Sequence, residues 1–134
     1  MWKCEPVVGA SLDVAEVTAL YRASTLGERR PVEDVERFTR MLAGANLVIT
    51  ARLDGRLIGI ARSITDGSYV TYLSDIAVDA EFQRRGVGRD LIRATREAAP
   101  QAKLVLLSAP AAVAYYPHLG FSRHESAWTL DALG

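Results

Sequence analysis

The chain has 134 residues, with 16 basic and 16 acidic side chains, so its formal net charge at neutral pH is zero. This length suits one domain, residues 1–134, that is large enough to bury a core. The charge balance argues against nonspecific binding to nucleic acids or anionic membranes, which need a basic surface. No apolar run approaches the roughly 18 residues of a membrane span, and the first residues lack a signal-peptide pattern.

Cysteine and histidine are scarce in this chain. Cys4 is the only cysteine, and His118 and His124 are the only histidines. An internal disulfide is therefore excluded, and a single thiol fits the reducing cytosol, so we expect a cytoplasmic protein. Zinc has no plausible set of ligands, and no metal is expected.

The first part of the chain predicts one strand followed by two helices. A strand candidate ends near Val8, and residues 13–16 (Asp-Val-Ala-Glu) have the spacing of a capping box. The helix behind this box should end before Gly27. Pro31 suits the first turn of a second helix, and Gly44 is a typical stop signal for it.

From residue 46 the pattern changes to strands. Residues 47–53 and 57–64 are apolar runs separated by Asp54-Gly55, which is a strong hairpin signal. A second turn at Asp66-Gly67 leads into a strand over residues 69–78. These three strands should form an antiparallel meander.

The rest of the chain predicts a crossover to a parallel strand. An amphipathic helix over residues 87–99 is followed by an apolar strand over 103–107, which should lie parallel to the strand before the helix. A short helix at 111–116 and a final strand over 121–130 complete the prediction. The fold class is α+β, with a central mixed sheet covered by helices.

The most informative segment is a glycine-bearing loop between a predicted strand and a predicted helix. Its sequence is Gln83-Arg84-Arg85-Gly86-Val87-Gly88. The first amides of a helix have no partner within it, and the helix dipole adds about half a positive charge there, so this end attracts phosphate. Glycines without a Cβ let an anion approach the backbone closely. The segment therefore predicts a site for a phosphate-bearing ligand.

Two common phosphate-binding motifs do not fit this loop. A P-loop would need Gly-Lys-Ser/Thr, but Gly88 is followed by Arg89-Asp90. A dinucleotide fingerprint would need a third glycine or alanine where the chain has Leu91, and parallel strands on both sides.

The pattern that fits is Gln/Arg-x-x-Gly-x-Gly/Ala after a strand, and with it the chain resembles the GNAT superfamily of acetyl-CoA-dependent N-acetyltransferases. Three segments carry the resemblance: residues 75–79 (Asp-Ile-Ala-Val-Asp), residues 83–88 with Leu91-Ile92, and residues 112–121, where two tyrosines precede Gly120-Phe121. The resemblance implies a GNAT-like mixed, mostly antiparallel sheet with helices on both faces. Its fourth and fifth strands would be parallel and splayed, with acetyl-CoA in the gap.

The resemblance also implies which residues hold acetyl-CoA. Backbone amides of the loop would bind the pyrophosphate, and the preceding strand would pair with the pantetheine arm as another strand would. One amide near Ile76 or Val78 would polarise the thioester carbonyl. The implied cofactor-binding residues are Ile76, Ala77, Val78, Gln83, Arg84, Arg85, Gly86, Val87, Gly88 and Arg89.

Tyr116 is the best candidate for catalysis, because it occupies the family position whose hydroxyl protonates the departing thiolate. A phenol with a pKa near 10 can donate to a thiolate whose thiol has a pKa of about 8.5. The alternative is a tyrosine that packs between helix and sheet and orients the cofactor. We expect Tyr115 to lie in the core. Ala109 stands where the family often has an asparagine whose side chain helps to bridge the cofactor and the chain. Alanine cannot make that bond.

The base that accepts the proton of the amine is less evident. Family members often use a carboxylate or histidine on the fourth strand, where this chain has Tyr72 and Ser74. Asp75 is the nearby carboxylate, as base or amine anchor, but strand alternation places it opposite Ser74 unless a bulge intervenes. The alternative is a carboxylate that accepts hydrogen bonds inside the sheet.

Acceptor specificity in this family comes from the first two helices and the loop between them, here residues 24–33. Its charged residues suit either an amine or an acidic substrate, and the small domain favours a small-molecule amine over a protein. His124 and Glu125 could border the acceptor pocket. A homodimer would fit the family. The alternative functions are a non-catalytic acyl-CoA-binding module and, from the arginines of residues 85–96, nucleic-acid binding.

Overall fold

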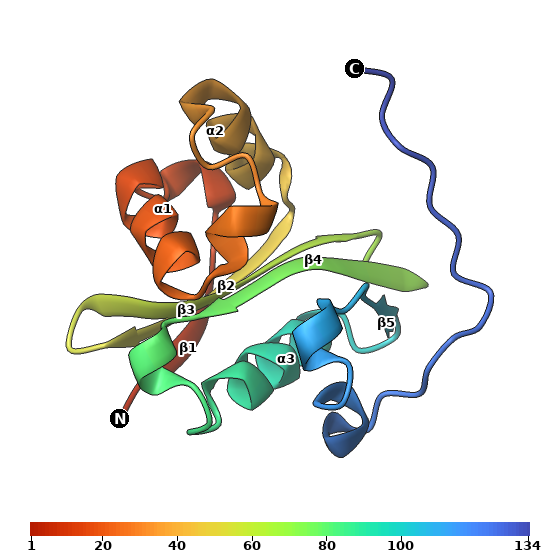
Figure 1. The fold of residues 1–134 in the computed structure, drawn as a ribbon. Coiled ribbons are helices and arrows are strands. Elements are labelled where there is room, and N and C mark those ends of the chain that lie inside the picture. Colours follow the sequence, from red (N-terminus) through yellow and green to blue (C-terminus); the bar gives the residue numbers. More distant parts are fainter.

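A twisted five-stranded sheet divides the molecule, with helices α1 and α2 on one face and α3 on the other (Figure 1). This computed structural model describes residues 1–134. The strands are β1 (Lys3–Val7), β2 (Leu47–Leu53), β3 (Arg56–Thr65), β4 (Val70–Val78) and β5 (Lys103–Val105). The helices are α1 (Val14–Ala23), α2 (Val35–Gly44) and α3 (Val87–Ala98).

The strands lie in the order β1-β2-β3-β4-β5, and every neighbouring pair is antiparallel except β4 and β5. The parallel pair is short, because it joins only Val70, Thr71 and Tyr72 to Lys103, Leu104 and Val105. Beyond this point the two strands separate, and the rest of β4 has a strand on one side only. The predicted α+β class and the splayed fourth and fifth strands are confirmed.

Local signals produced the hairpin and the first helix as expected. Asp54 and Gly55 both have positive φ, 51° and 82°, which is the conformation that a tight two-residue hairpin needs. Asp13 caps α1 by accepting from the amides of Ala15 and Glu16. The reciprocal half of the capping box is absent, because the Glu16 carboxylate pairs with Arg52 instead, at 2.8 Å.

The second helix begins later than predicted. Pro31 lies before it, and Asp34 is its N-cap, accepting from the amide of Arg37 at 3.1 Å. An aspartate that can bond to a first-turn amide is a stronger start signal than a proline three residues earlier.

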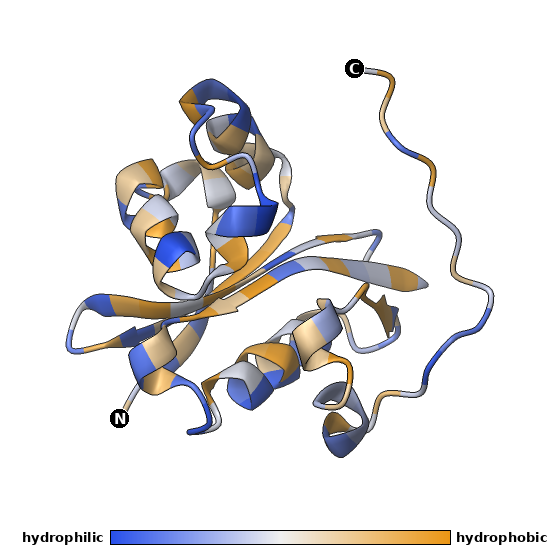
Figure 2. Ribbon diagram, in the orientation of Figure 1, coloured by the Kyte–Doolittle hydropathy of each residue, from blue (hydrophilic) through white to orange (hydrophobic).

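The sheet buries an apolar cluster on each face, and Figure 2 shows apolar colour along the central strands. The first cluster joins α1 and α2 to the sheet through Tyr21 and Phe38, whose rings meet edge to face at 5.0 Å. The second joins α3 to the sheet. Gly59 permits close approach there, because a Cβ would lie 3.0 Å from both Val87 and Leu91. This packing holds the start of α3 beside β4.

The C-terminal part of the chain differs from the prediction. β5 ends at Val105, the short helix at 111–116 is replaced by 3-10 turns at Pro110–Ala112 and Tyr116–Leu119, and no strand forms over residues 121–130. The last backbone hydrogen bond runs from the Phe121 amide to the Tyr116 carbonyl. Apolar residues alternate too sparsely in this polar segment to require a sheet partner.

The longest helix, α3, has 12 residues and is too short and too polar to cross a lipid bilayer. No group of three or more metal-ligating side chains is present.

Candidate active site

The start of α3 presents unpartnered amides, as the loop sequence predicted. Gly86 is the N-cap with φ of 98°, a left-handed conformation that favours glycine, and no side chain caps the helix. The first-turn amides of Val87, Gly88 and Arg89 therefore have no partner from a capping side chain. The acidic residue nearest this end, Asp90, accepts from the Trp2 indole at 2.8 Å. The helix end can hold an anion.

Three arginines lie near the start of α3: Arg84 and Arg85 precede it, and Arg89 is in its first turn. Arg84 and Arg85 are exposed, and Arg84 has φ of 65°, which is uncommon for a residue with a side chain. The Arg85 guanidinium lies over the Phe82 ring, 5.4 Å from its centre. Arg89 is also exposed. These side chains add positive charge around the helix end and remain free to move toward a ligand.

The free edge of β4 leads toward this helix end. The Asp79 amide donates to the Ile58 carbonyl of β3, and backbone groups alternate in direction along an antiparallel strand, so those of Ile76 and Val78 point away from β3. The side-chain amide of Gln83 donates to the Val78 carbonyl at 2.9 Å. By the same alternation the backbone groups of Ala77, which lies opposite Ile60, point toward β3. Ile76 and Val78 thus offer the groups that an added strand would use.

Tyr116 borders a small cavity of about 50 Å³ where β4 and β5 separate. Its ring packs edge to face on Phe121 at 5.4 Å. Burial, with a smaller effect from Tyr115, raises the pKa of Tyr116, so the phenol keeps its proton at neutral pH. The other lining residues come from the turn after α1, from β4 and from the segment after β5. They are Leu26, Arg29, Arg30, Leu73, Ser74, Ile76, Leu106, Leu107 and Ala109.

Tyr115 is not a core residue, contrary to our expectation. Its side chain is 42% exposed, and a Cβ on Gly88 would lie 3.0 Å from its hydroxyl. The hydroxyl therefore reaches the first turn of α3. Because the Tyr115 and Tyr116 rings pack edge to face at 5.4 Å, the two phenols connect the start of α3 to the cavity.

Asp75 is fully buried and accepts hydrogen bonds on both oxygens. Arg62 donates to Oδ2 at 2.6 Å and Tyr21 donates to the same oxygen at 2.7 Å. Arg30 donates to Oδ1 at 2.6 Å, and the Ser74 hydroxyl lies 3.2 Å from Oδ1. Burial alone would raise the pKa of Asp75, but the bonds and charge of Arg62, with Tyr21 and Arg30, lower it below its usual range. This carboxylate has no free acceptor position for an amine, which speaks against the expected base or anchor role.

A bulge in β4 explains why Asp75 faces α1. Arg62 is paired with Asp75 and Ser63 with Leu73, which leaves Ser74 as an extra residue. The bulge reverses the alternation, so Leu73 joins the α3 cluster while Asp75 meets Tyr21. Arg30 donates to the backbone carbonyl of Ser74 at 3.0 Å. The bulge is thus held by side chains from outside the sheet.

Sequence reasoning gave no role to Tyr21, Arg30 or Arg62, the partners of Asp75. They lie 54, 45 and 13 residues from it in the chain. The only available signal was a carboxylate in an apolar strand, which must have found buried partners. His124 and Glu125 are exposed and do not line the cavity.

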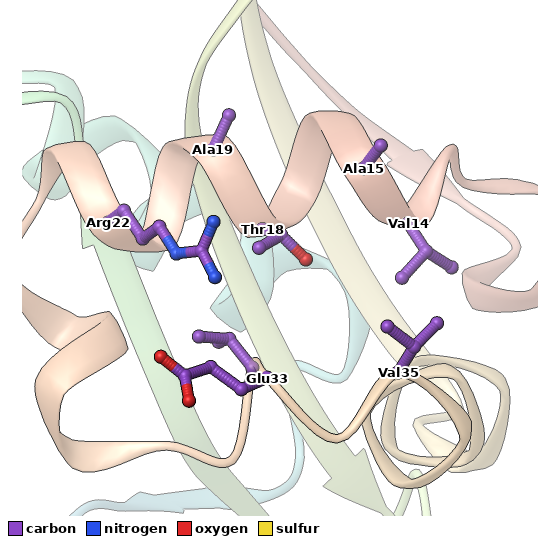
Figure 3. A pocket seen from close by; sticks show the side chains of 8 residues that line it. Val14, Ala15, Thr18, Ala19, Arg22, Glu33 and Val35 are labelled. Carbon is purple, nitrogen blue, oxygen red and sulfur yellow. The ribbon is translucent and has the colours of Figure 1, made fainter.

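A larger hollow of about 410 Å³ lies between α1 and the segment that leads into α2 (Figure 3). It is formed by small apolar side chains of α1 and by residues 32–35, and the side chains of Arg22 and Glu33 extend toward each other across it. It shares no lining residue with the cavity at Tyr116. Although this hollow has the larger volume, we do not take it as the reaction site, because no tyrosine and no free backbone amide of β4 or α3 lines it.

Comparison with known proteins agrees with this geometry. The family model described as an acetyltransferase (GNAT) domain matches residues 22–131. The chain therefore belongs to the GNAT acetyltransferase family, and it is an acyltransferase enzyme. A comparison with curated protein sequences gave no significant match.

Solved structures share the fold at low sequence identity. A GNAT-family protein from Streptococcus pneumoniae superposes with a TM-score of 0.78 at 19% identity, covering 98% of this chain and 100% of that one. An aminoglycoside acetyltransferase from an uncultured soil sample, in complex with trehalose, gives 0.73 at 20% identity, covering 99% and 97%. An aminoglycoside N-acetyltransferase in complex with CoA gives 0.73 at 18% identity, covering 100% and 96%.

Proposed function

We propose that this enzyme transfers an acetyl group from acetyl-CoA to a primary amine of a small molecule, directly, in a ternary complex. The observation that carries the proposal is the open edge of β4 leading to the uncapped start of α3. Amides of Val87, Gly88 and Arg89 would hold the pyrophosphate, and the backbone of Ile76 and Val78 would pair with the pantetheine arm. Arginines 84, 85 and 89 would add charge, while Gln83 supports the edge by holding the Val78 carbonyl.

The reaction proposed is attack by the amine nitrogen on the thioester carbonyl carbon, with the CoA thiolate as the leaving group. A backbone amide of Ile76 or Val78 would stabilise the developing oxyanion. Tyr116, which lines the cavity, would give its hydroxyl proton to the thiolate as the carbon–sulfur bond breaks. Cys4 is half-buried on β1 rather than in the cavity, so no acetyl-enzyme is proposed.

No side chain that lines the cavity is a free base, since its polar residues are two arginines, a serine and Tyr116. We therefore propose that the amine enters in its neutral form and that water takes the remaining proton after attack. Nearby positive charge disfavours an ammonium ion and so lowers the pKa of the bound amine. Juxtaposition of the two substrates would supply much of the rate.

The test is an amine-library screen read out by free CoA, repeated with Tyr116→Phe. We expect turnover by the wild type and a loss of about 100-fold in kcat for the variant, with little change in acetyl-CoA affinity, because one proton donor is removed. The control is Tyr69→Phe, an exposed tyrosine outside the cavity. Acetyl-CoA binding without turnover of any amine would favour the alternative, a non-catalytic acyl-CoA sensor. Turnover of a peptide amine alone would make a protein the acceptor.

A further inference from the structure

The acceptor side of the cavity carries an excess of positive charge. Arg29 and Arg30 are its only charged lining residues. Arg30 shares the single carboxylate of Asp75 with Arg62, so two guanidinium groups balance one negative charge. Arg29 makes no ion pair and donates no side-chain hydrogen bond; only its backbone carbonyl is used, by Arg30 at 2.8 Å.

No other group nearby offsets this charge. Tyr21 is neutral, because burial and then the charge of Asp75 raise its pKa well above the usual value. Glu28 is exposed and does not line the cavity, while Glu33 lines the separate, larger hollow beside α1. Two guanidinium groups therefore share one carboxylate, and a third, that of Arg29, lines the same cavity without a negatively charged partner.

The turn that carries Arg29 is tightly constrained. Thr25 has φ of 73°, a left-handed conformation that is strained for a β-branched residue, and it begins the 3-10 turn Leu26–Arg29. The Ser24 hydroxyl accepts from the Leu26 amide at 3.2 Å and donates to the Tyr21 carbonyl at 2.9 Å. Arg30 fixes the other end of the turn to Asp75. A strained turn fixed at both ends places the backbone of Arg29 beside the cavity, and its guanidinium has no protein partner to leave when a ligand binds.

Resting on the function proposed above, we propose that the acceptor is an amine that also carries an anionic group, and that Arg29 binds this group. A free guanidinium forms paired hydrogen bonds to carboxylate or phosphate oxygens. The surrounding charge repels polycationic amines and favours the neutral form of the reacting amine. Substrates of the amino-acid type fit this chemistry, whereas polyamines and aminoglycosides do not.

The experiment compares matched acceptors that differ in one group: L-phenylalanine, L-phenylalaninamide and 2-phenylethylamine, with the corresponding alanine series. Binding is measured by calorimetry in the presence of CoA, and kcat/KM is expressed per neutral amine. We expect the carboxylate member to be favoured by about 10-fold or more, the range of a charge-assisted hydrogen bond. Arg29→Gln should remove the preference, Arg29→Lys should restore part of it, and Arg29→Glu should reverse it. Arg22→Gln, an exposed arginine on α1, should leave it unchanged.

Equal or stronger binding of the members without a carboxylate would overturn the proposal, as would a preference that survives in Arg29→Gln. Preferential, Arg29-dependent binding of the carboxylate member without turnover would support the anion site while contradicting the proposed acetyl transfer. Because binding and turnover are measured separately, failure of the two proposals can be distinguished.

Discussion

The two sides of the proposed reaction site differ in whether main-chain or side-chain groups form them. The donor side consists of main-chain groups, on the edge of β4 and at the start of α3, within one short stretch of sequence. The acceptor side consists of side chains, with Tyr21, Arg30 and Arg62 converging on Asp75 from distant segments. Main-chain sites depend on backbone shape and tolerate many side chains, so they can be shared by a family. Side-chain sites depend on identity and can differ from one member to the next.

The largest expected effect tests the acceptor side. Asp75→Asn removes the charge shared by the buried Arg62 and the partly buried Arg30, so the free energy of unfolding should fall by about 3–5 kcal/mol. Urea denaturation measures it. Tyr21→Phe removes one hydrogen bond to the same carboxylate and should cost only about 1 kcal/mol. A loss below 1 kcal/mol for Asp75→Asn would show that the carboxylate does not organise this side.

The next test concerns the donor side. Gly88→Val should weaken acetyl-CoA binding by about 100-fold while changing stability little, because a side chain at the helix start blocks access to the amides. The added Cβ would also lie 3.0 Å from the Tyr115 hydroxyl. Calorimetry measures the affinity, and Gly44→Ala, where a Cβ meets nothing within 4 Å, is the control. Unchanged affinity would place the pyrophosphate elsewhere.

Acid should weaken the acceptor side, with a smaller effect than removal of the carboxylate. The pKa of Asp75 is lower in the folded protein than in the unfolded chain, where it is about 3.9. Its stabilisation is therefore complete above that value and is lost as the pH falls through the folded pKa. Unfolding followed between pH 7 and pH 2 should show this loss in the wild type and less of it in Asp75→Asn. Parallel curves would contradict the assignment.

The smallest expected effect concerns the exposed arginines of the loop. Arg84→Gln and Arg85→Gln should each weaken acetyl-CoA binding only about 2- to 5-fold, with a reduced dependence on salt, since exposed charge pairs contribute little. A loss as large as that of Gly88→Val would mean that side chains, rather than amides, hold the phosphates.

The difference between a main-chain site and a side-chain site also explains what could be predicted from sequence. The glycine loop, the hairpin at Asp54-Gly55 and the amphipathic third helix have local signals, and the structure contains all of them. The environment of Asp75 depends on contacts across up to 54 residues, which no local pattern records. Of the two adjacent tyrosines, Tyr116 takes the inward position and Tyr115, expected in the core, is exposed. The strand expected over 121–130 does not form, because apolar residues alternate too sparsely in that segment to require a sheet partner.

The bulge at Ser74 also affects how this enzyme is compared with its relatives. An inserted residue changes whether odd or even positions of β4 face the first two helices, so a one-residue error in placing a gap exchanges the two faces. At about 20% identity, an alignment without coordinates can therefore match Asp75 with residues that point toward the opposite layer. Transfer of functional residues along this strand should rely on superposed backbones, with the bulge as the reference point.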